Sequence, residues 1–418
     1  MPHIGFMGIS GSRARKLFAA GPWASLIFLV SLNLRPAIAA VGPVLARIGA
    51  DLHWAEGLQG VLTAIPLLAF AVVSPLVMFL ARRIGVDASV LVALLCIAIG
   101  DFIRSFGGSA GIWLGTVIFA SAIAVGNVLV PVVAKRDYAD HVPMATGIYS
   151  GCITAGSATA GLLSEPIAGI WNDWRPSLAV WSVPPLLVAL LWSLRILHCR
   201  KSAVDDAGRE NYGRVPLPAA ASTDSTRAVF AHVLRRPMTW YVTLFMGLQS
   251  SAFYTMSNWM PSVSSSIGFD ASTAGAHLFI FQGVGILSGL LVPRLMDVRG
   301  SQVYAAVASS VPMLISGLGM LLLPRVMPVW ALIGGCAQGA SLVVALALIA
   351  LRGHDGAETV ALSGIVQSLG YLIASLGPLM FGMLAQLTGG YRMSLVVFTA
   401  TAFLQCVVAV LAGRPDGM

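Results

Sequence analysis

Long apolar runs recur along the whole chain and are separated by short polar stretches. A helix rises about 1.5 Å per residue, so about 20 apolar residues are needed to cross the hydrocarbon core of a bilayer. We expect membrane-spanning helices at 22–45, 57–81, 86–106, 110–134, 143–170, 176–197, 237–264, 272–296, 302–323, 326–350, 358–387 and 391–412. The pattern therefore predicts an all-α membrane protein with twelve transmembrane helices.

One long polar stretch, residues 198–236, interrupts this pattern near the middle of the chain. It carries charged residues and a tract of Pro, Ala, Ser and Thr, a composition typical of a flexible linker. We expect a six-helix bundle over residues 1–197, a cytoplasmic linker over 198–236 and a second six-helix bundle over 237–418.

The two predicted bundles resemble each other at a nearly constant offset. A shift of 218 positions brings Pro75 onto Pro293, and a shift of 217 brings Trp174 onto Tyr391. Such parallel repeats are related by a pseudo-twofold axis along the membrane normal, and substrate binds between them near the midplane. The sequence thus predicts two pseudo-symmetric six-helix repeats.

The composition excludes a soluble protein and gives an orientation. Only 10% of the residues are charged, too few to cover a soluble surface, whereas 57% are hydrophobic. If both termini lie inside, 19 of the 25 Lys and Arg residues fall on inner segments and 5 on outer ones. This excess predicts that both termini are cytoplasmic, and it explains the net charge of +8 without a nucleic-acid partner.

The first apolar run follows three basic residues, as the core of a signal peptide does. Arg35 and Pro36 interrupt this run, so we expect an uncleaved helix. The five cysteines are scattered and no pair has the spacing of metal ligands. We find no phosphate-binding loop and no nucleophile motif, and therefore expect no enzyme, no catalytic residue, no cofactor and no metal site.

A single charge, Arg35, lies near the middle of the first span. A charge at that depth costs at least ~2.5–3.5 kcal/mol on insertion scales, so such residues usually face a cavity and function there. On a continuous helix its face would be shared by Leu32, Ala39 and Gly42. The forked guanidinium suits a small planar anion. The alternative is an internal ion pair, or bonds to backbone carbonyls at a helix break near Pro36.

Four stretches together carry a family resemblance: Leu32–Pro43, Gly126–Asp137, Gly247–Tyr254 and Ala361–Pro378. They fall in the first, fourth, seventh and eleventh spans, and the chain resembles the cyanate / 2-nitroimidazole transporter family of the major facilitator superfamily. The usual superfamily signature after the second helix is reduced here to Arg82–Gly85. The resemblance implies the major facilitator fold and alternating-access transport across a bacterial inner membrane.

In this superfamily helices 1, 4, 7 and 10 line the cavity, so their polar and aromatic residues are the remaining candidates for substrate binding. These candidates are Asn33, Asn127, Gln249, Phe253, Tyr254 and Gln338, with Gln367 and Tyr371 on helix 11 as weaker ones.

Phe253 occupies the repeat position of Arg35, so a cation in one half would oppose an aromatic wall in the other. Helix packing is the alternative for both aromatic residues. Asn33 lies about 200° around the helix from Arg35 and is expected to form a cross-helix hydrogen bond. Asn127 precedes Pro131 by one turn, and site-lining and structural roles are both open for it.

Helices 1, 4, 7 and 10 carry no carboxylate within the membrane, which argues against a central proton-binding acid. Glu165 on helix 5 has no cation beside it in the sequence. It is a candidate for proton coupling, with a structural role at the outer end of the helix as the alternative. Asp101 and Arg104 are three residues apart and predict an ion pair.

The function predicted is a secondary active transporter of a small polar or anionic solute, such as a cyanate-like anion or a nitroheterocycle. A broader drug-like efflux carrier and a non-transporting membrane receptor are the alternatives. The partners expected are the substrate and the lipid bilayer, and we expect a monomer.

Overall fold

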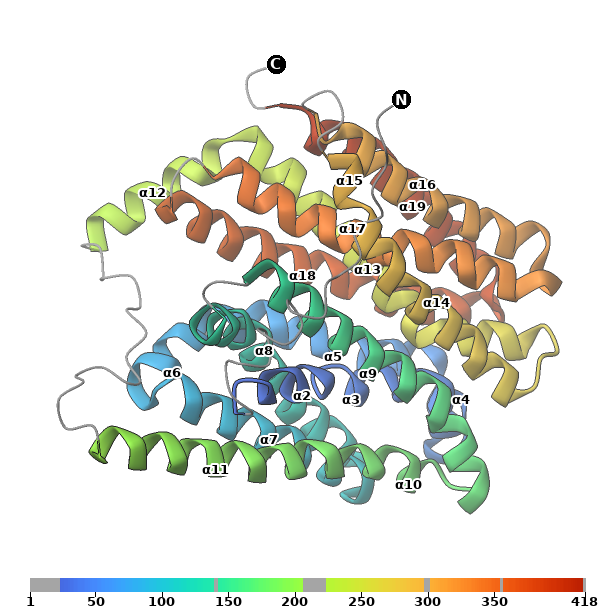
Figure 1. The fold of residues 1–418 in the computed structure, drawn as a ribbon. Coiled ribbons are helices and arrows are strands. Elements are labelled where there is room, and N and C mark those ends of the chain that lie inside the picture. The colour runs from blue at the N-terminus through green and yellow to red at the C-terminus, as the bar shows by residue number, and fades with distance from the viewer. Residues whose placement is uncertain (1–22, 139–141, 206–222, 297–300, 354–355, 416–418) are drawn as a thin grey trace, which may run out of the picture.

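The computed structural model describes residues 23–138, 142–205, 223–296, 301–353 and 356–415, which contain helices and turns but no strand. Figure 1 shows these helices running side by side in two groups. The first half comprises α2 (Leu26–Leu32), α3 (Pro36–Ala39), α4 (Val41–Leu52), α5 (Glu56–Val73), η2 (Ser74–Leu76), α6 (Val77–Ile84), α7 (Val86–Phe106), α8 (Gly108–Asp137), α9 (Val142–Trp171), α10 (Trp174–Ala179), η4 (Val180–Ser182) and α11 (Val183–Asp205). The second half comprises α12 (Thr223–Arg235), α13 (Pro237–Ser266), α14 (Ala271–Leu291), α15 (Pro293–Met296), α16 (Val303–Leu322), η6 (Pro324–Val326), α17 (Met327–Arg352), α18 (Gly356–Thr388) and α19 (Tyr391–Gly413).

The described helices follow the twelve predicted spans. Ten spans among the described residues are long and apolar enough to cross a membrane. The two remaining predicted spans are α9 and α13, each 30 residues long. Both contain many Ser and Thr residues, α9 is also rich in Gly, and both lie against the opposite half, α9 beside α14 and α13 beside α4. Their weaker hydropathy follows from this position, because they face protein more than lipid.

The repeat predicted from the sequence is visible in the helix boundaries. In the first half α5 gives way to the short helix η2 at Pro75, and in the second half α14 ends just before Pro293. Trp174 begins α10 and Tyr391 begins α19. Proline interrupts the regular helix at equivalent positions because it lacks the N–H that continues the helical ladder.

Residues 198–236 differ from the flexible linker expected from their composition. Residues 198–205 continue α11, and α12 covers most of the second part of this stretch. His232 of α12 and Arg236, which follows α12, contact the Glu358 carboxylate at 3.6 and 3.2 Å. The intervening residues 206–222 lie outside the described part of the chain.

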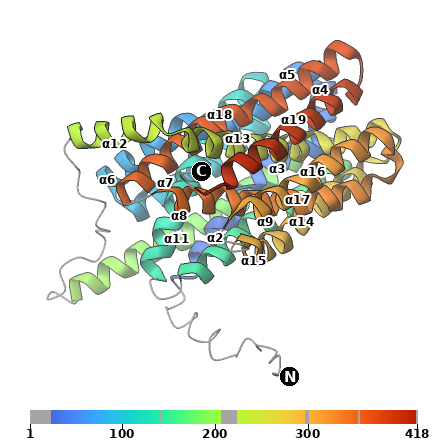
Figure 2. The same ribbon diagram turned by 90° about the horizontal axis from the view of Figure 1, so that it is seen from above.

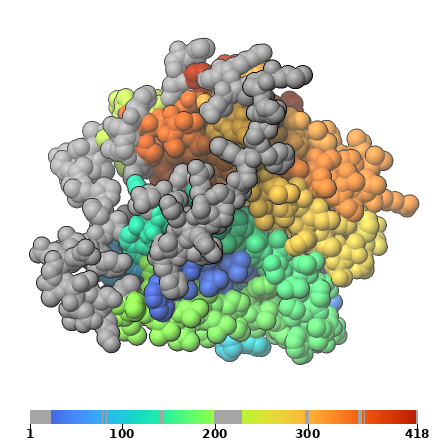
Figure 3. All heavy atoms as spheres, viewed as in Figure 1, coloured from blue at the N-terminus to red at the C-terminus, as the bar shows by residue number. Residues whose placement is uncertain are grey.

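The two halves pack against each other through α9 with α14 and through α5 with α18 (Figures 1 and 2). At the end where α4 turns into α5, which we call the Trp54 end, the contact is close. Figure 3 shows the yellow residues of the second half directly against the green residues of the first half toward this end.

Glycines make the close contact at the Trp54 end possible. A Cβ at Gly42 would stand 2.5 Å from the Ser257 carbonyl oxygen, and a Cβ at Gly60 would stand 3.0 Å from the Leu379 carbonyl oxygen. The backbone N–H of Gly57 donates to Gln386 Oε1 at 3.0 Å. Each of these contacts joins the first half to the second.

Toward the opposite end, which we call the linker end, the corresponding glycines are free of neighbours. Gly147 and Gly151 on α9, and Gly364 on α18, have no atom within 4 Å of the position of a Cβ. Further along the same helices, Gly161 packs on Leu278 and Gly382 packs on the Glu56 backbone. The two halves therefore meet at the Trp54 end and lie further apart at the linker end.

Candidate functional site

The first membrane span is broken at the residues that carry its charge. Regular helix stops at Leu32 and resumes at Pro36, and Arg35 has φ −128° and ψ −23°. Because Pro36 has no N–H, the Leu32 carbonyl has no helical donor. Arg35 therefore leaves from irregular backbone. The expectation that it shares a helical face with Leu32 was wrong, because that face requires a continuous helix.

Two neighbouring helices contact the break through glycine. Gly156 of α9 leaves no room for a Cβ because the Leu32 carbonyl lies against it, and Gly126 of α8 is covered by the Leu34 side chain. Irregular backbone at membrane depth is tolerated where protein surrounds it or where it lines a cavity. Here the break is packed on these sides and presents Arg35 toward the second half.

The Arg35 guanidinium faces two adjacent aromatic rings of the opposite half. Its Cζ is 5.1 Å from the centre of the Phe253 ring and 5.2 Å from the centre of the Tyr254 ring, both on α13. A desolvated cation–π contact contributes about 2 kcal/mol. The opposition of Arg35 and Phe253 that the repeat offset predicted is present in the structure.

Within the described residues, no hydrogen bond or ion pair of the Arg35 side chain is present, and its buried Nε has no partner. Among the described residues, Arg35 therefore forms neither the internal ion pair nor the bonds to backbone carbonyls that were the alternative. Burying a charge costs several kcal/mol after relaxation. Two ring contacts offset only part of that cost, and the planar donor edge of the guanidinium remains available to an acceptor.

More aromatic residues surround this cation. The Tyr254 hydroxyl is buried and has no hydrogen-bond partner among the described residues. Phe70 of α5 contacts Tyr254 edge-on at 6.5 Å between ring centres and Tyr371 of α18 at 5.3 Å. Sequence reasoning missed Phe70, because an aromatic residue inside an apolar span carries no signal of its position.

Two of the other candidate residues use their polar groups within their own helix. Asn33 Nδ2 donates to the Leu29 carbonyl at 2.8 Å, so the expected cross-helix hydrogen bond is not the one formed. Asn33 is the C-cap of α2, and its side chain forms this hydrogen bond with the preceding turn. Gln249 Nε2 donates to the neighbouring Ser250 Oγ at 2.7 Å.

Three further candidates lie on α8, α17 and α18. Asn127 is half-buried, one turn before Pro131, and makes no hydrogen bond with the described residues. The Gln338 amide of α17 packs against Gly285 of α14 and is enclosed between α14 and α17. Gln367 donates to Ser363 Oγ at 2.7 Å. Of these three, Asn127 alone keeps a half-exposed amide without a partner in the described structure.

Glu165 has a cationic partner that the sequence does not reveal. Arg47 of α4, 118 positions away, contacts it at 2.6 Å through Nη2, and Nε of the same guanidinium donates to both carboxylate oxygens. The Glu165 side chain is 6% exposed and that of Arg47 is 36% exposed. Glu165 has no cation beside it in the sequence, but the fold brings Arg47 to it, and the forked contact fits the structural alternative.

The ion pair predicted between Asp101 and Arg104 is present, with Nη2 2.7 Å from Oδ1. Both side chains are completely buried. Arg104 Nη1 also donates to the Ala37 carbonyl of α3.

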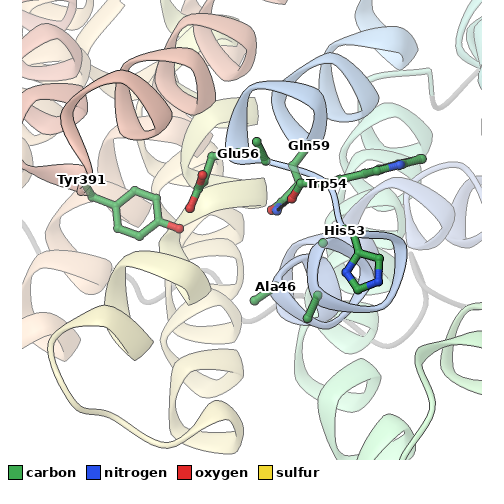
Figure 4. Close-up of a pocket in the computed structure, with 9 residues that line it drawn as sticks. Ala46, His53, Trp54, Glu56, Gln59 and Tyr391 are labelled. Atoms are coloured by element: carbon green, nitrogen blue, oxygen red, sulfur yellow. Dashed lines mark hydrogen bonds between the residues drawn. The ribbon is translucent and has the colours of Figure 1, made fainter.

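A separate pocket of about 410 Å³ opens at the Trp54 end, away from Arg35 (Figure 4). Its walls are the turn between α4 and α5 and the start of α19, and Figure 4 shows Glu56 and Tyr391 pointing toward one another across it. Gln59 in its wall already donates to the Trp54 carbonyl at 3.0 Å. None of the predicted binding residues lines this pocket, so we do not place the substrate there.

Two pseudo-symmetric helical halves, in contact at one end and enclosing an unpaired cation between them, define the architecture of a secondary transporter. Residues 27–353 match the Major Facilitator Superfamily, and the chain belongs to this family. It is a multi-pass membrane transporter of a small solute and not an enzyme.

Named relatives agree with this assignment. The chain is 34% identical over 392 residues to the uncharacterized transporter YycB of Bacillus subtilis (strain 168), covering 93% of this chain and 92% of that protein. It is 30% identical over 393 residues to the 2-nitroimidazole transporter of Escherichia coli (strain K12), covering 93% and 94%. The crystal structure of the nucleoside transporter NupG shares the fold, with a TM-score of 0.73, 11% identity and coverage of 94% and 99%.

Proposed function

We propose that this protein carries a small planar anion or a nitroheterocycle, which binds between Arg35 and the Phe253–Tyr254 rings. The observation that carries this proposal is the unpaired guanidinium of Arg35, which faces two adjacent rings of the opposite half. Guanidinium donors grip two acceptor atoms in one plane, and aromatic walls favour a flat solute. The buried Tyr254 hydroxyl supplies a further donor at the same place.

The transport cycle proposed is alternating access, in which the two halves rock about this site. Closure at the Trp54 end and separation at the linker end support a state open toward the linker end. With both termini cytoplasmic in a bacterial inner membrane, as the basic residues and the relatives favour, this state is inward-facing. A monomer suffices, because both walls of the site come from one chain.

Thermal-shift measurements on the purified protein test the proposal with sodium cyanate, sodium benzoate and 2-nitroimidazole as probes. A ligand that binds the folded state at 100 times its Kd stabilises it by about 2.7 kcal/mol. We expect at least one probe to raise the melting temperature of the wild type.

The variants then decide whether Arg35 binds that probe. Arg35→Ala should abolish the shift, and Arg35→Lys should restore it poorly because an ammonium lacks the planar fork. Arg325→Ala, at an exposed arginine in η6, is the matched control and should bind as the wild type does. Wild-type affinity in Arg35→Ala would refute the proposed site.

A broader drug-like efflux carrier is the second candidate function. The aromatic residues around Arg35, namely Phe70, Phe253, Tyr254 and Tyr371, favour flat apolar solutes as well as anions. A drug-like efflux function predicts that neutral aromatic compounds stabilise Arg35→Ala as well as they stabilise the wild type. The leading proposal predicts that Arg35→Ala is stabilised by none of the probes that stabilise the wild type.

A further inference from the structure

The Asp101–Arg104 pair lies directly beside the break in the first span. The two residues are one turn apart on α7, and neither side chain has any exposed surface. The Arg104 guanidinium reaches out of its own helix, and its Nη1 donates to the Ala37 carbonyl at 2.6 Å. Ala37 is two positions beyond Arg35, in the four-residue helix α3 that follows the break.

The surroundings of Arg104 fix its position. At Gly100, a Cβ would stand 2.8 Å from the Gly115 carbonyl oxygen, so α7 and α8 lie backbone to backbone around this pair. Phe119 of α8 covers the guanidinium, with Cζ 4.6 Å from the ring centre. Asp101 Oδ1 forms an ion pair with Nη2 at 2.7 Å, although neither atom has a hydrogen-bond partner among the described residues, and the Ala37 carbonyl accepts a hydrogen bond from Nη1. Arg104 is therefore immobilised by one anion, one ring and one carbonyl.

The break itself has little means of holding its own shape. α3 is only four residues long before Ala40 leads into α4, and the Leu32 carbonyl lacks a helical donor. Glycine contacts from α8 and α9 pack against Leu34 and Leu32, on the α2 side of the break. On the α3 side, the bond from Arg104 to Ala37 joins the resumed helix to the body of the first half.

We propose that Asp101 and Arg104 are positioning residues that set the direction in which Arg35 points toward Phe253 and Tyr254. Asp101 holds Arg104, Arg104 holds Ala37, and the position of Ala37 fixes where the backbone of Arg35 leaves the break. This role rests on the proposed function of Arg35 as the substrate-binding cation. Neither residue contacts the Arg35 side chain, so both act through the backbone.

The test removes both charges at once. In Asp101→Leu/Arg104→Met neither ion is left alone in the interior, and such hydrophobic replacements of buried pairs are often neutral or stabilising. We expect a melting temperature close to that of the wild type and an affinity at least about tenfold weaker, for whichever of sodium cyanate, sodium benzoate and 2-nitroimidazole binds the wild type. Arg47→Met/Glu165→Leu removes another ion pair of the same half and should leave that affinity unchanged.

A double-mutant cycle separates positioning from general packing. The same double substitution is then made in an Arg35→Lys background and measured at high probe concentration. It should change the affinity less than about twofold, because the Arg35 guanidinium that Asp101 and Arg104 position is already absent. Equal fold losses in both backgrounds, or wild-type affinity in the double variant, would overturn the inference.

Two results keep the test decisive. If the double variant does not fold, Arg104→Lys is measured in the same cycle. A lysine can remain beside Asp101 but has no second arm for Ala37, so the same tenfold loss is expected and an unchanged affinity refutes positioning. The single variant Arg35→Ala tests the proposed function separately: wild-type binding there refutes the site, whatever the Arg104 variants show.

Discussion

Replacing Gly42 by alanine should shift the protein away from the conformation in which its halves meet at the Trp54 end. Gly42 of α4 packs on the backbone of α13, and the added Cβ would stand 2.5 Å from the Ser257 carbonyl oxygen and 3.2 Å from Asn258 Cα. Backbone atoms cannot rotate away as a flexible side chain does. The two helices must therefore part until the closest contact approaches 3.4 Å, where ordinary van der Waals contact begins.

The size of the shift follows from the cost of overpacking. Inserting a methyl group into a well-packed contact costs about 1–3 kcal/mol. If that cost is confined to the closed arrangement, its population relative to the open one falls about 5- to 150-fold. Alanine also stabilises a helix by roughly 0.5–1 kcal/mol relative to glycine, but this gain is the same in every conformation that keeps α4 helical.

Gly283→Ala is the matched control, because Gly283 is also inside a helix but has no atom within 4 Å of its Cβ position. Leu58 and Leu387 are both exposed at the Trp54 end, and one lies in each half. Spin labels at these two positions report the distance between the halves by pulsed electron paramagnetic resonance. Gly42→Ala should enlarge the long-distance population, whereas Gly283→Ala should not. Identical distance distributions in the two variants would show that the Gly42 contact does not control closure.

Three further outcomes test the assignment. Glu165→Gln should lower stability by no more than about 1 kcal/mol, since Arg47 is partly exposed, and should leave gradient-driven accumulation in proteoliposomes intact; accumulation lost while exchange persists would make Glu165 the coupling residue. Phe253→Leu should weaken binding of a planar probe about 5- to 30-fold, whereas Phe253→Tyr should keep it, and equal affinities would remove the ring from the site. Cysteine labelling should place 198–236 and both termini on one side and Trp171–Arg175 on the other, and a common side for both segments contradicts the twelve-span topology.

The positions of the helices could be predicted because bilayer thickness fixes their length and proline fixes their interruptions. Pro75 and Pro293 interrupt equivalent helices, as their offset of 218 positions indicates. The same offset placed Phe253 opposite Arg35, and the rings do lie there. This part of the site was accessible from sequence because a repeat converts a spacing along the chain into a relation in space.

What the sequence did not reveal depends on contacts between helices that are distant in the chain. The partner of Glu165 is 118 positions away, and no local spacing points to Arg47. Asn33 was assigned a partner on another helix because a continuous first span was assumed, whereas the break lets it bond to Leu29. Composition likewise concealed α12, since a polar stretch reads as a linker until a partner such as α18 is known.

The break in the first span makes the two walls of the proposed site differ in structure, although the helices that carry Arg35 and Phe253 occupy equivalent positions in the two repeats. The position after Arg35 is Pro36, whereas the position after Phe253 is Tyr254, whose N–H allows α13 to run unbroken from Pro237 to Ser266. One wall is therefore a cation on irregular backbone and the other is a pair of rings on a continuous helix. A ligand can shift a conformational equilibrium only by its differential affinity for the two states. In the proposed cycle, rocking changes the distance between the cation and the rings, because they belong to different halves. A solute that contacts both then binds one conformation better than the other, and this difference couples its binding to the movement of the halves.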